Sequence, residues 1–154
     1  MGYCMNMQDS SFYIPKASFS DALAAIKGVM NNSDKMHGAS YEGGKETCRW
    51  YSWVNTDAVL AAETLQEAMF VWRWKPYIGD SGDIEGISFY GEKSGQDEVF
   101  FRAIAPFVKS DSYICMHGED GAHWRWYFDG FRCLEQNGKV VYEAEPVYTI
   151  VIGA

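Results

Sequence analysis

The sequence lacks any apolar run that approaches the roughly 20 residues needed by a membrane-spanning helix. Its first six residues, Met1-Gly2-Tyr3-Cys4-Met5-Asn6, contain neither the basic region nor the apolar stretch of a secretory signal peptide. These absences argue against a membrane span and against export. We therefore expect a cytoplasmic protein that makes no contact with a membrane.

Cysteine motifs and catalytic signatures are also missing. No Cys-x-x-Cys pair is present, which argues against zinc-ribbon and thioredoxin-type sites. There is no Gly-x-Ser-x-Gly, His-Glu-x-x-His, P-loop or dinucleotide-binding fingerprint. The sequence therefore predicts no cofactor and no metal. It also predicts reduced thiols, although an even number of cysteines would permit two disulfides: Cys4, Cys48, Cys115 and Cys133.

Basic residues are scarce: 13 Lys and Arg stand against 21 Asp and Glu, which gives a net charge of −8. A field of this sign repels duplex DNA and anionic lipid, so we expect neither as a direct ligand. Most of the negative charge falls in the second half of the chain. The segment 80–98 contains one cation, Lys93, and six carboxylates: Asp80, Asp83, Glu85, Glu92, Asp97 and Glu98. The plain interpretation is a solvated surface, and the functional one is an acidic patch that attracts a basic protein.

Aromatic side chains are abundant: six Trp, ten Tyr and nine Phe make up 16% of the 154 residues. Hydrophobic residues reach 47% and charged residues 22%, as in ordinary globular proteins. This length favours one domain, 1–154, with a substantial core. The excess of rings predicts a sheet-rich interior or a recognition surface.

Apolar residues recur at helical spacing in three segments. The first covers residues 19–30. The second begins at Thr56, and the capping-box pair Thr64 and Glu67 inside it indicates a break. The third begins at Asp97 and should end near Pro106. Residues 31–49 are polar and turn-forming, so we expect a long loop there.

Strands are predicted where the pattern changes to a period of two and turn residues follow. The first strand ends at Phe12-Tyr13-Ile14, and residues 112–143 form a meander, because Asp129-Gly130 and Asn137-Gly138 are strong hairpin signals. Strands that cluster after helices favour an α+β fold, with an antiparallel sheet of about six strands and about three helices on one face. The other predicted strands cover 50–54, 72–75, 84–90, 112–117, 123–128, 131–136, 139–143 and 147–152.

Four short motifs carry a resemblance to other proteins: Ile104-Ala105-Pro106-Phe107-Val108, Ser112-Tyr113-Ile114, Gly118-Glu119-Asp120-Gly121 and Trp124-Arg125-Trp126. With these motifs the chain resembles, over about residues 64–136, a group of small uncharacterised proteins of bacteria and their phages. The resemblance transfers no catalytic residue. It implies a bacterial or phage-infected cell, a setting in which small acidic proteins often inhibit host defence, as anti-CRISPR proteins do.

Two segments place a cation between tryptophans: Trp72-Arg73-Trp74-Lys75 and Trp124-Arg125-Trp126-Tyr127. On a strand, alternate residues share a face, so the tryptophans are most simply core. The opposite face should then be too apolar for water and should meet a partner or a second copy of the chain. Such rings with Arg are typical of binding hot spots. The candidate binding residues are Arg73, Tyr113, Arg125, Tyr127 and Phe131, with Cys115 and Cys133 on the same face.

The most reactive-looking cluster spans nine residues. Two histidines with two carboxylates are potential zinc ligands, and a cysteine with a histidine would make a nucleophile and its base. A hairpin turn explains the two carboxylates without any chemistry. This cluster is the basis of an enzymatic alternative: Cys115, His117, Glu119, Asp120 and His123.

Taken together, these patterns favour a non-enzymatic protein-binding module or inhibitor that acts through the acidic segment and the aromatic sheet face. A phage or mobile-element anti-defence protein is the form that the resemblance implies. The first alternative is a small-ligand or nucleotide-binding protein, in which Arg73 or Arg125 and nearby rings hold a planar anion. The enzyme is the second alternative. A homodimer is compatible with all three.

Overall fold

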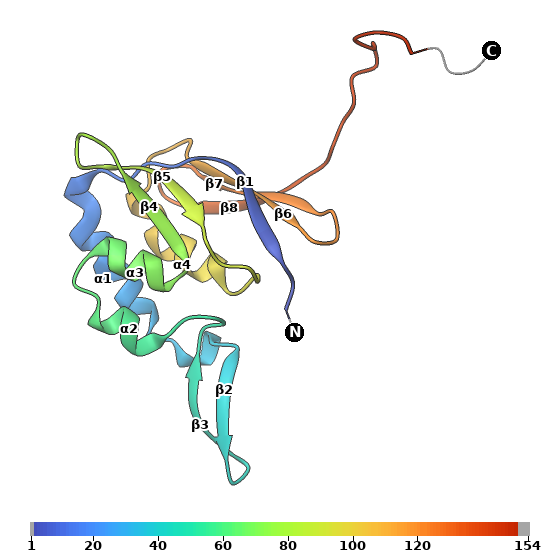
Figure 1. Cartoon of the computed structure of the whole chain (residues 1–154). Coiled ribbons are helices and arrows are strands. Elements are labelled where there is room, and N and C mark those ends of the chain that lie inside the picture. The colour runs from blue at the N-terminus through green and yellow to red at the C-terminus, as the bar shows by residue number, and fades with distance from the viewer. Residues whose placement is uncertain (1, 151–154) are drawn as a thin grey trace.

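The computed structural model describes residues 2–150, in which four helices lie on one side of a layer of antiparallel strands (Figure 1). The predicted α+β class with antiparallel pairing is confirmed. The predicted counts were wrong in detail. Residues 2–150 contain eight strands in three sheets, of four, two and two strands, and four α-helices instead of three. No helix within residues 2–150 is long and apolar enough to cross a bilayer.

The largest sheet has the strand order β1-β6-β7-β8. Three of its strands form the predicted meander, in which β6 and β7 join through a turn at 119–122 and β7 and β8 through one at 129–132. The N-terminal strand β1 pairs antiparallel with β6, and a bulge interrupts the pairing between Met7 and Asp9. The four strands are β1 (Met5–Ser11), β6 (Tyr113–Gly118), β7 (His123–Phe128) and β8 (Cys133–Gly138).

A two-stranded ribbon of β4 (Trp74–Ile78) and β5 (Ile84–Phe89) continues the curve of this sheet. Ile14 and Ile84 exchange two backbone hydrogen bonds of 3.0 and 2.9 Å. Pro76 lies in β4, which pairs with β5 alone, so its missing N–H breaks no central ladder.

The helices begin and end close to the predicted positions. Helix α1 (Phe19–Val29) matches the first segment, and α4 (Asp97–Ile104) matches the third. The expected break is confirmed, because the second segment splits into α2 (Thr56–Ala61) and α3 (Leu65–Val71). The Thr64 hydroxyl caps α3 by accepting a 3.1 Å hydrogen bond from the Glu67 N–H.

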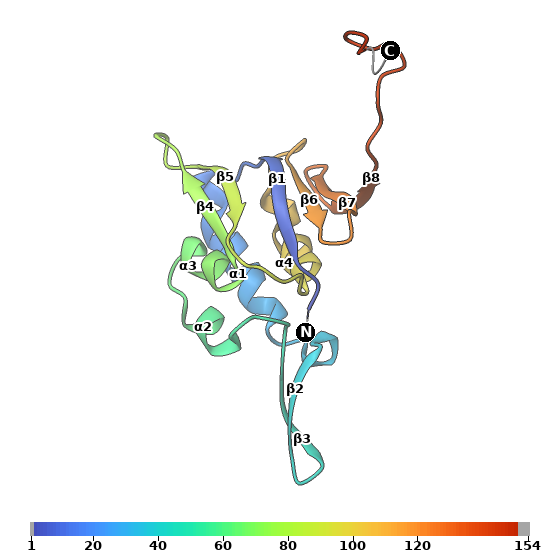
Figure 2. The same cartoon turned by 45° about the vertical axis from the view of Figure 1, so that its right-hand side comes forward.

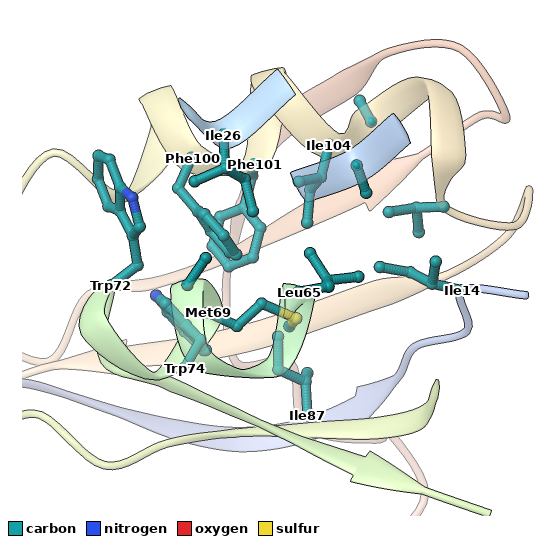
Figure 3. Close-up of a cluster of buried hydrophobic side chains, with 14 of the residues drawn as sticks. Ile14, Ile26, Leu65, Met69, Trp72, Trp74, Ile87, Phe100, Phe101 and Ile104 are labelled. Carbon is teal, nitrogen blue, oxygen red and sulfur yellow. The ribbon is translucent and has the colours of Figure 1, made fainter. Parts of the chain in front are cut away.

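The core between the helices and the strands is built largely of rings. Trp74 lies edge-on to Phe101 and to Trp126, with ring centroids 4.9 and 6.0 Å apart. Figure 3 shows Trp72, Trp74 and the two α4 phenylalanines packed among aliphatic side chains. The large fully buried side chains are Trp72, Trp74, Tyr51, Phe100, Phe101, Phe128, Ile14, Ile26, Leu65, Met69, Ile84 and Ile104.

Two predictions in the first third of the chain were wrong. Residues 31–49 are not a loop, since β2 (Gly38–Glu42) and β3 (Lys45–Trp50) form a hairpin that projects from the body (Figure 2). The positive φ angles of Gly43 and Gly44, 59° and 80°, make its two-residue turn. The strand predicted over 50–54 is a turn, because Trp50 ends β3 and Trp53 has a φ of 67°.

Three predicted strands near the C-terminus also differ. The strand predicted over 131–136 occupies 133–138, and Gly138 pairs with His123 instead of forming a turn with Asn137. Residues 139–150 contain no strand, so the strand predicted over 139–143 is absent. The last predicted strand, 147–152, is absent over its first four residues, and residues 151 and 152 lie outside the described part.

Candidate binding face of the four-stranded sheet

Alternation along β6 and β7 gives the sheet two unlike sides. Ile114, Met116, Trp126 and Phe128 point toward the helices and are buried, which confirms the core position predicted for Trp126 and Phe128. Trp124, also predicted in the core, packs against it and is half-buried. The intervening side chains point away from the helices, and we call this side the outer face. Its residues in the four strands are Asn6, Gln8, Asp9, Ser11, Tyr113, Cys115, His117, His123, Arg125, Tyr127, Leu134, Gln136 and Gly138.

Arg125 lies at the centre of the outer face. Its guanidinium carbon is 5.9 Å from the ring centroid of Tyr113 and 5.4 Å from that of Tyr127, so it makes cation–π contacts with both. Its Nε donates a hydrogen bond to Oε1 of Gln136. The Arg125 side chain is exposed, and within residues 2–150 no carboxylate lies within ion-pair distance of it. The positive charge is therefore held in place and left without an ionic partner.

The two tyrosines are fixed by carboxylates at the margin of the face. The Tyr113 hydroxyl donates to Oδ2 of Asp9 at 3.3 Å, and the Tyr127 hydroxyl donates to Oδ1 of Asp111. The negative charge of Asp9 raises the pKa of Tyr113, and the hydrogen bond to Asp111 raises the pKa of Tyr127. Both phenols therefore remain neutral, and their rings flank the guanidinium in defined positions.

The two histidines meet across the β6–β7 pair, as expected from their positions. His117 and His123 stack with centroids 4.6 Å apart and planes 6° from parallel. The bulge in β1 turns Gln8 toward this face, where its Oε1 lies 3.2 Å from Nδ1 of His123. The described residues contain no group of three or more His, Cys, Asp or Glu side chains that could hold a metal ion.

The remaining members of the reactive-looking cluster lie apart from the histidines or are poorly suited to chemistry. Glu119 accepts a 2.9 Å hydrogen bond from the N–H of Cys4, and Asp120 accepts one from the hydroxyl of Tyr3. These two carboxylates therefore hold the N-terminal segment. Burial raises the pKa of the Cys115 thiol, which disfavours the thiolate that nucleophilic chemistry requires.

Arg73 is not on the outer face, contrary to the prediction. Its Nη2 lies 3.1 Å from Oδ1 of Asp97, and both side chains are nearly enclosed, with exposed fractions of 11% and 2%. The Trp74 indole N–H donates to the same oxygen at 2.9 Å, and the Gly95 N–H donates to the other at 3.0 Å. Arg73 has a φ of 74° just after α3, so it departs from the strand alternation on which the prediction rested.

The acidic segment does not present six carboxylates on one surface. Asp97 is buried in the ion pair with Arg73, and Asp83 is half-buried. Asp83 accepts a 2.7 Å hydrogen bond from the Lys16 N–H and another from the Tyr13 hydroxyl, which lower its pKa. Asp80 and Glu85, near the β4–β5 turn, and Glu92, beyond the opposite end of β5, are exposed. Glu98, on α4, is half-buried.

Phe131 and Cys133 also leave the predicted set. Cys133 pairs with Phe128, and residues directly opposite in an antiparallel pair share a side, so Cys133 faces the core. Burial raises the pKa of its thiol to about 12. Phe131 lies in the four-residue turn before β8 and is 79% exposed, so it is at the margin of the sheet and not on its face.

The outer-face residues contributed by β1 and β8 were not identified from the sequence. Leu134 and Gln136 lie opposite Tyr127 and Arg125. The prediction had placed the odd-numbered residues of this strand outward, although pairing across the hairpin puts them on the side of the buried Phe128. Asp9 lies in β1, where the polar stretch Gln8-Asp9-Ser10-Ser11 gave no strand pattern. The pairing of β1 with β6, which brings Asp9 opposite Cys115, is a long-range contact that no local pattern indicates.

A hollow of about 580 Å³ adjoins Arg125 at one end of the outer face. Its lining includes Arg125, Gln136 and His123 of the sheet and residues 139 and 140, where the chain leaves β8. Its size lies in the range of small-ligand sites. Comparison of the chain with protein-family models, with curated proteins and with solved structures returned no match, so its function must be argued from these residues.

Proposed function

We propose that this chain is a non-enzymatic protein-binding module whose outer face forms the contact with its partner. One observation carries the proposal: Arg125 is exposed, positioned between two tyrosine rings and free of any ionic partner within the described residues. Arginine and tyrosine are enriched at the centres of protein interfaces, where a few residues supply most of the binding energy. No helix of the described chain covers this side of the sheet (Figure 2).

The charge distribution favours a particular kind of partner. The net charge of −8 attracts a basic protein over long range, while Arg125 binds a carboxylate or carbonyl group at the centre of the contact. Among binding modules, the resemblance to small bacterial and phage proteins favours an inhibitor. A defence protein with a basic nucleic-acid groove is the target that this charge would suit. If the partner binds through such a groove, added nucleic acid should compete for it and release it from the protein.

The test compares two exposed arginines on opposite sides of the sheet. Immobilised wild-type protein is incubated with a lysate of the organism that carries the gene, beside Arg125→Ala and the control Arg102→Ala on α4. We expect wild type and control to retain the same protein in stoichiometric amount. Arg125→Ala should bind it about 30-fold more weakly, the effect of losing a hot spot of about 2 kcal/mol. Equal retention by both variants, or no retained protein, would overturn the proposal.

The hollow beside Arg125 supports a second candidate, a site for a planar anionic ligand such as a nucleotide. The guanidinium would pair with the anion and the tyrosine rings would stack on its plane. A ligand at 100 times its dissociation constant should add about 2.7 kcal/mol to the free energy of unfolding. A thermal-shift screen with nucleotides and cyclic dinucleotides tests this, and unchanged melting temperatures throughout would eliminate it.

A further inference from the structure

The outer edge of β8 is open. Within residues 2–150, β8 pairs with β7 on one side and with no strand on the other. Four of its six residues, Glu135 to Gly138, are exposed. An unpaired edge of this kind presents a row of free N–H and C=O groups, which is a template for another strand.

Residues 139–150, here called the tail, continue directly from this edge strand. The tail forms no helix or strand and runs away from the body of the molecule in both views (Figures 1 and 2). Apolar side chains stand out along it and contact little of the protein. The most exposed are Val141 at 74%, Tyr142 at 87% and Val147 at 91%. Exposed apolar residues in a row are typical of a segment that is buried when the protein binds another molecule.

The sequence of the tail is that of a half-buried strand. Val140, Tyr142 and Ala144 alternate with Lys139, Glu143 and Glu145, and only Val141 departs from the polar side. Valine and tyrosine are favoured in strands. Pro146 follows Glu145 and sets a limit to regular pairing. The tail therefore offers a seven-residue strand, 139–145, of a length that matches β8.

Its own β8 is not the natural partner of the tail. To pair there, the chain would have to reverse at residues 137 and 138, but both remain in β8, where Gly138 pairs with His123. Each copy of the chain thus carries the open β8 edge and, directly after it, a strand that this edge does not take up. A second copy supplies a tail for the open β8 edge and an open β8 edge for the tail. A two-fold axis between the copies pairs both at once.

We propose that residues 139–145 of one copy add as a strand to the outer edge of β8 of a second copy, and that the exchange is reciprocal. Each copy then gains a fifth strand in its main sheet, and Val140 and Tyr142, which share one side of the added strand, pack against side chains of the partner's β8. The exchange uses the backbone edge of β8 and the tail, whereas the binding function proposed for Arg125 uses the outer face. Only the hollow of the second candidate function shares residues 139 and 140 with the tail.

The experiment measures mass and backbone protection on the full chain. Sedimentation at high concentration should give twice 17.4 kDa for wild type. The double variant Val140→Asp with Tyr142→Asp should stay at 17.4 kDa, because two carboxylates cannot occupy the apolar side of the added strand. The control Tyr41→Asp, an equally drastic change at a 67% exposed tyrosine on the β2–β3 hairpin, should remain a dimer. All three should have the same thermal stability when dilute.

Hydrogen exchange distinguishes exchange between copies from folding back within one. Amides of residues 140–143 should become protected only as the protein concentration rises, in step with dimer formation. A wild type that remains at 17.4 kDa at the highest concentration would overturn the proposal. So would a dimer unaffected by the double variant, or tail amides protected in the monomer.

Discussion

The chain contains the triplet Trp-Arg-Trp twice, and the two copies have opposite roles. In 124–126 the backbone is a regular strand, so both tryptophans face the helices and Arg125 faces out. In 72–74 the triplet crosses the end of α3, and the positive φ of Arg73 turns its side chain inward to Asp97. Identical residues thus give a structural ion pair in one place and an exposed hot-spot candidate in the other. The backbone conformation at the arginine decides which.

The largest expected effect is on stability, at the first triplet. Arg73→Ala leaves the Asp97 side chain, 2% exposed, without a cation. An uncompensated buried charge should lower the free energy of unfolding by about 3–5 kcal/mol. Urea unfolding monitored by tryptophan fluorescence measures the loss. Arg125→Ala is the matched control and should change the value by less than about 0.5 kcal/mol. Similar losses in the two variants would remove the distinction between the triplets.

The last tryptophan of each triplet sharpens the comparison. Trp74 donates to buried Asp97 at 2.9 Å, and Trp126 donates to exposed Glu135 at 3.1 Å. Replacing each by Phe removes the indole N–H and a similar volume. We expect about 2 kcal/mol more destabilisation for Trp74→Phe, because water can replace the lost donor at Glu135 but not at Asp97. Denaturant midpoints measure both, and a larger loss for Trp126→Phe would contradict this account.

Strand segments with one buried side could be predicted from the sequence, and segments exposed on both sides could not. The two-sided alternation of β6 and β7 was predicted, because burial on one face imposes a period of two. The β2–β3 hairpin buries little of either side, so no period marks it, and only its Gly43-Gly44 turn was a signal. The inward position of Arg73 depended on where α3 ends, to the residue, and local patterns do not fix that boundary.

The smallest expected effect concerns acid. The N–H groups of Arg132 and Phe131, with the Arg132 side chain, lower the pKa of Asp129 from 3.8 to about 2. Asp129 is the first residue of the turn that joins β7, which contains the second triplet, to β8. Its lowered pKa gives stability that is complete above about pH 4 and is lost as the pH falls toward 2. Asp129→Asn should therefore reduce the decline of the urea midpoint between pH 4 and pH 2. An unchanged decline would show that the turn does not depend on this charge.

The opposite orientation of the two arginines is tested most directly by chemical modification. Folded protein is treated with phenylglyoxal, which reacts with accessible guanidinium groups, and each arginine is followed by peptide mass spectrometry. Arg125 should be modified at a rate close to that of Arg132, whose side chain is 70% exposed, whereas Arg73 should react only after unfolding. If Arg73 is modified as fast as Arg125 in the folded protein, the buried ion pair and the contrast between the two arginines are contradicted.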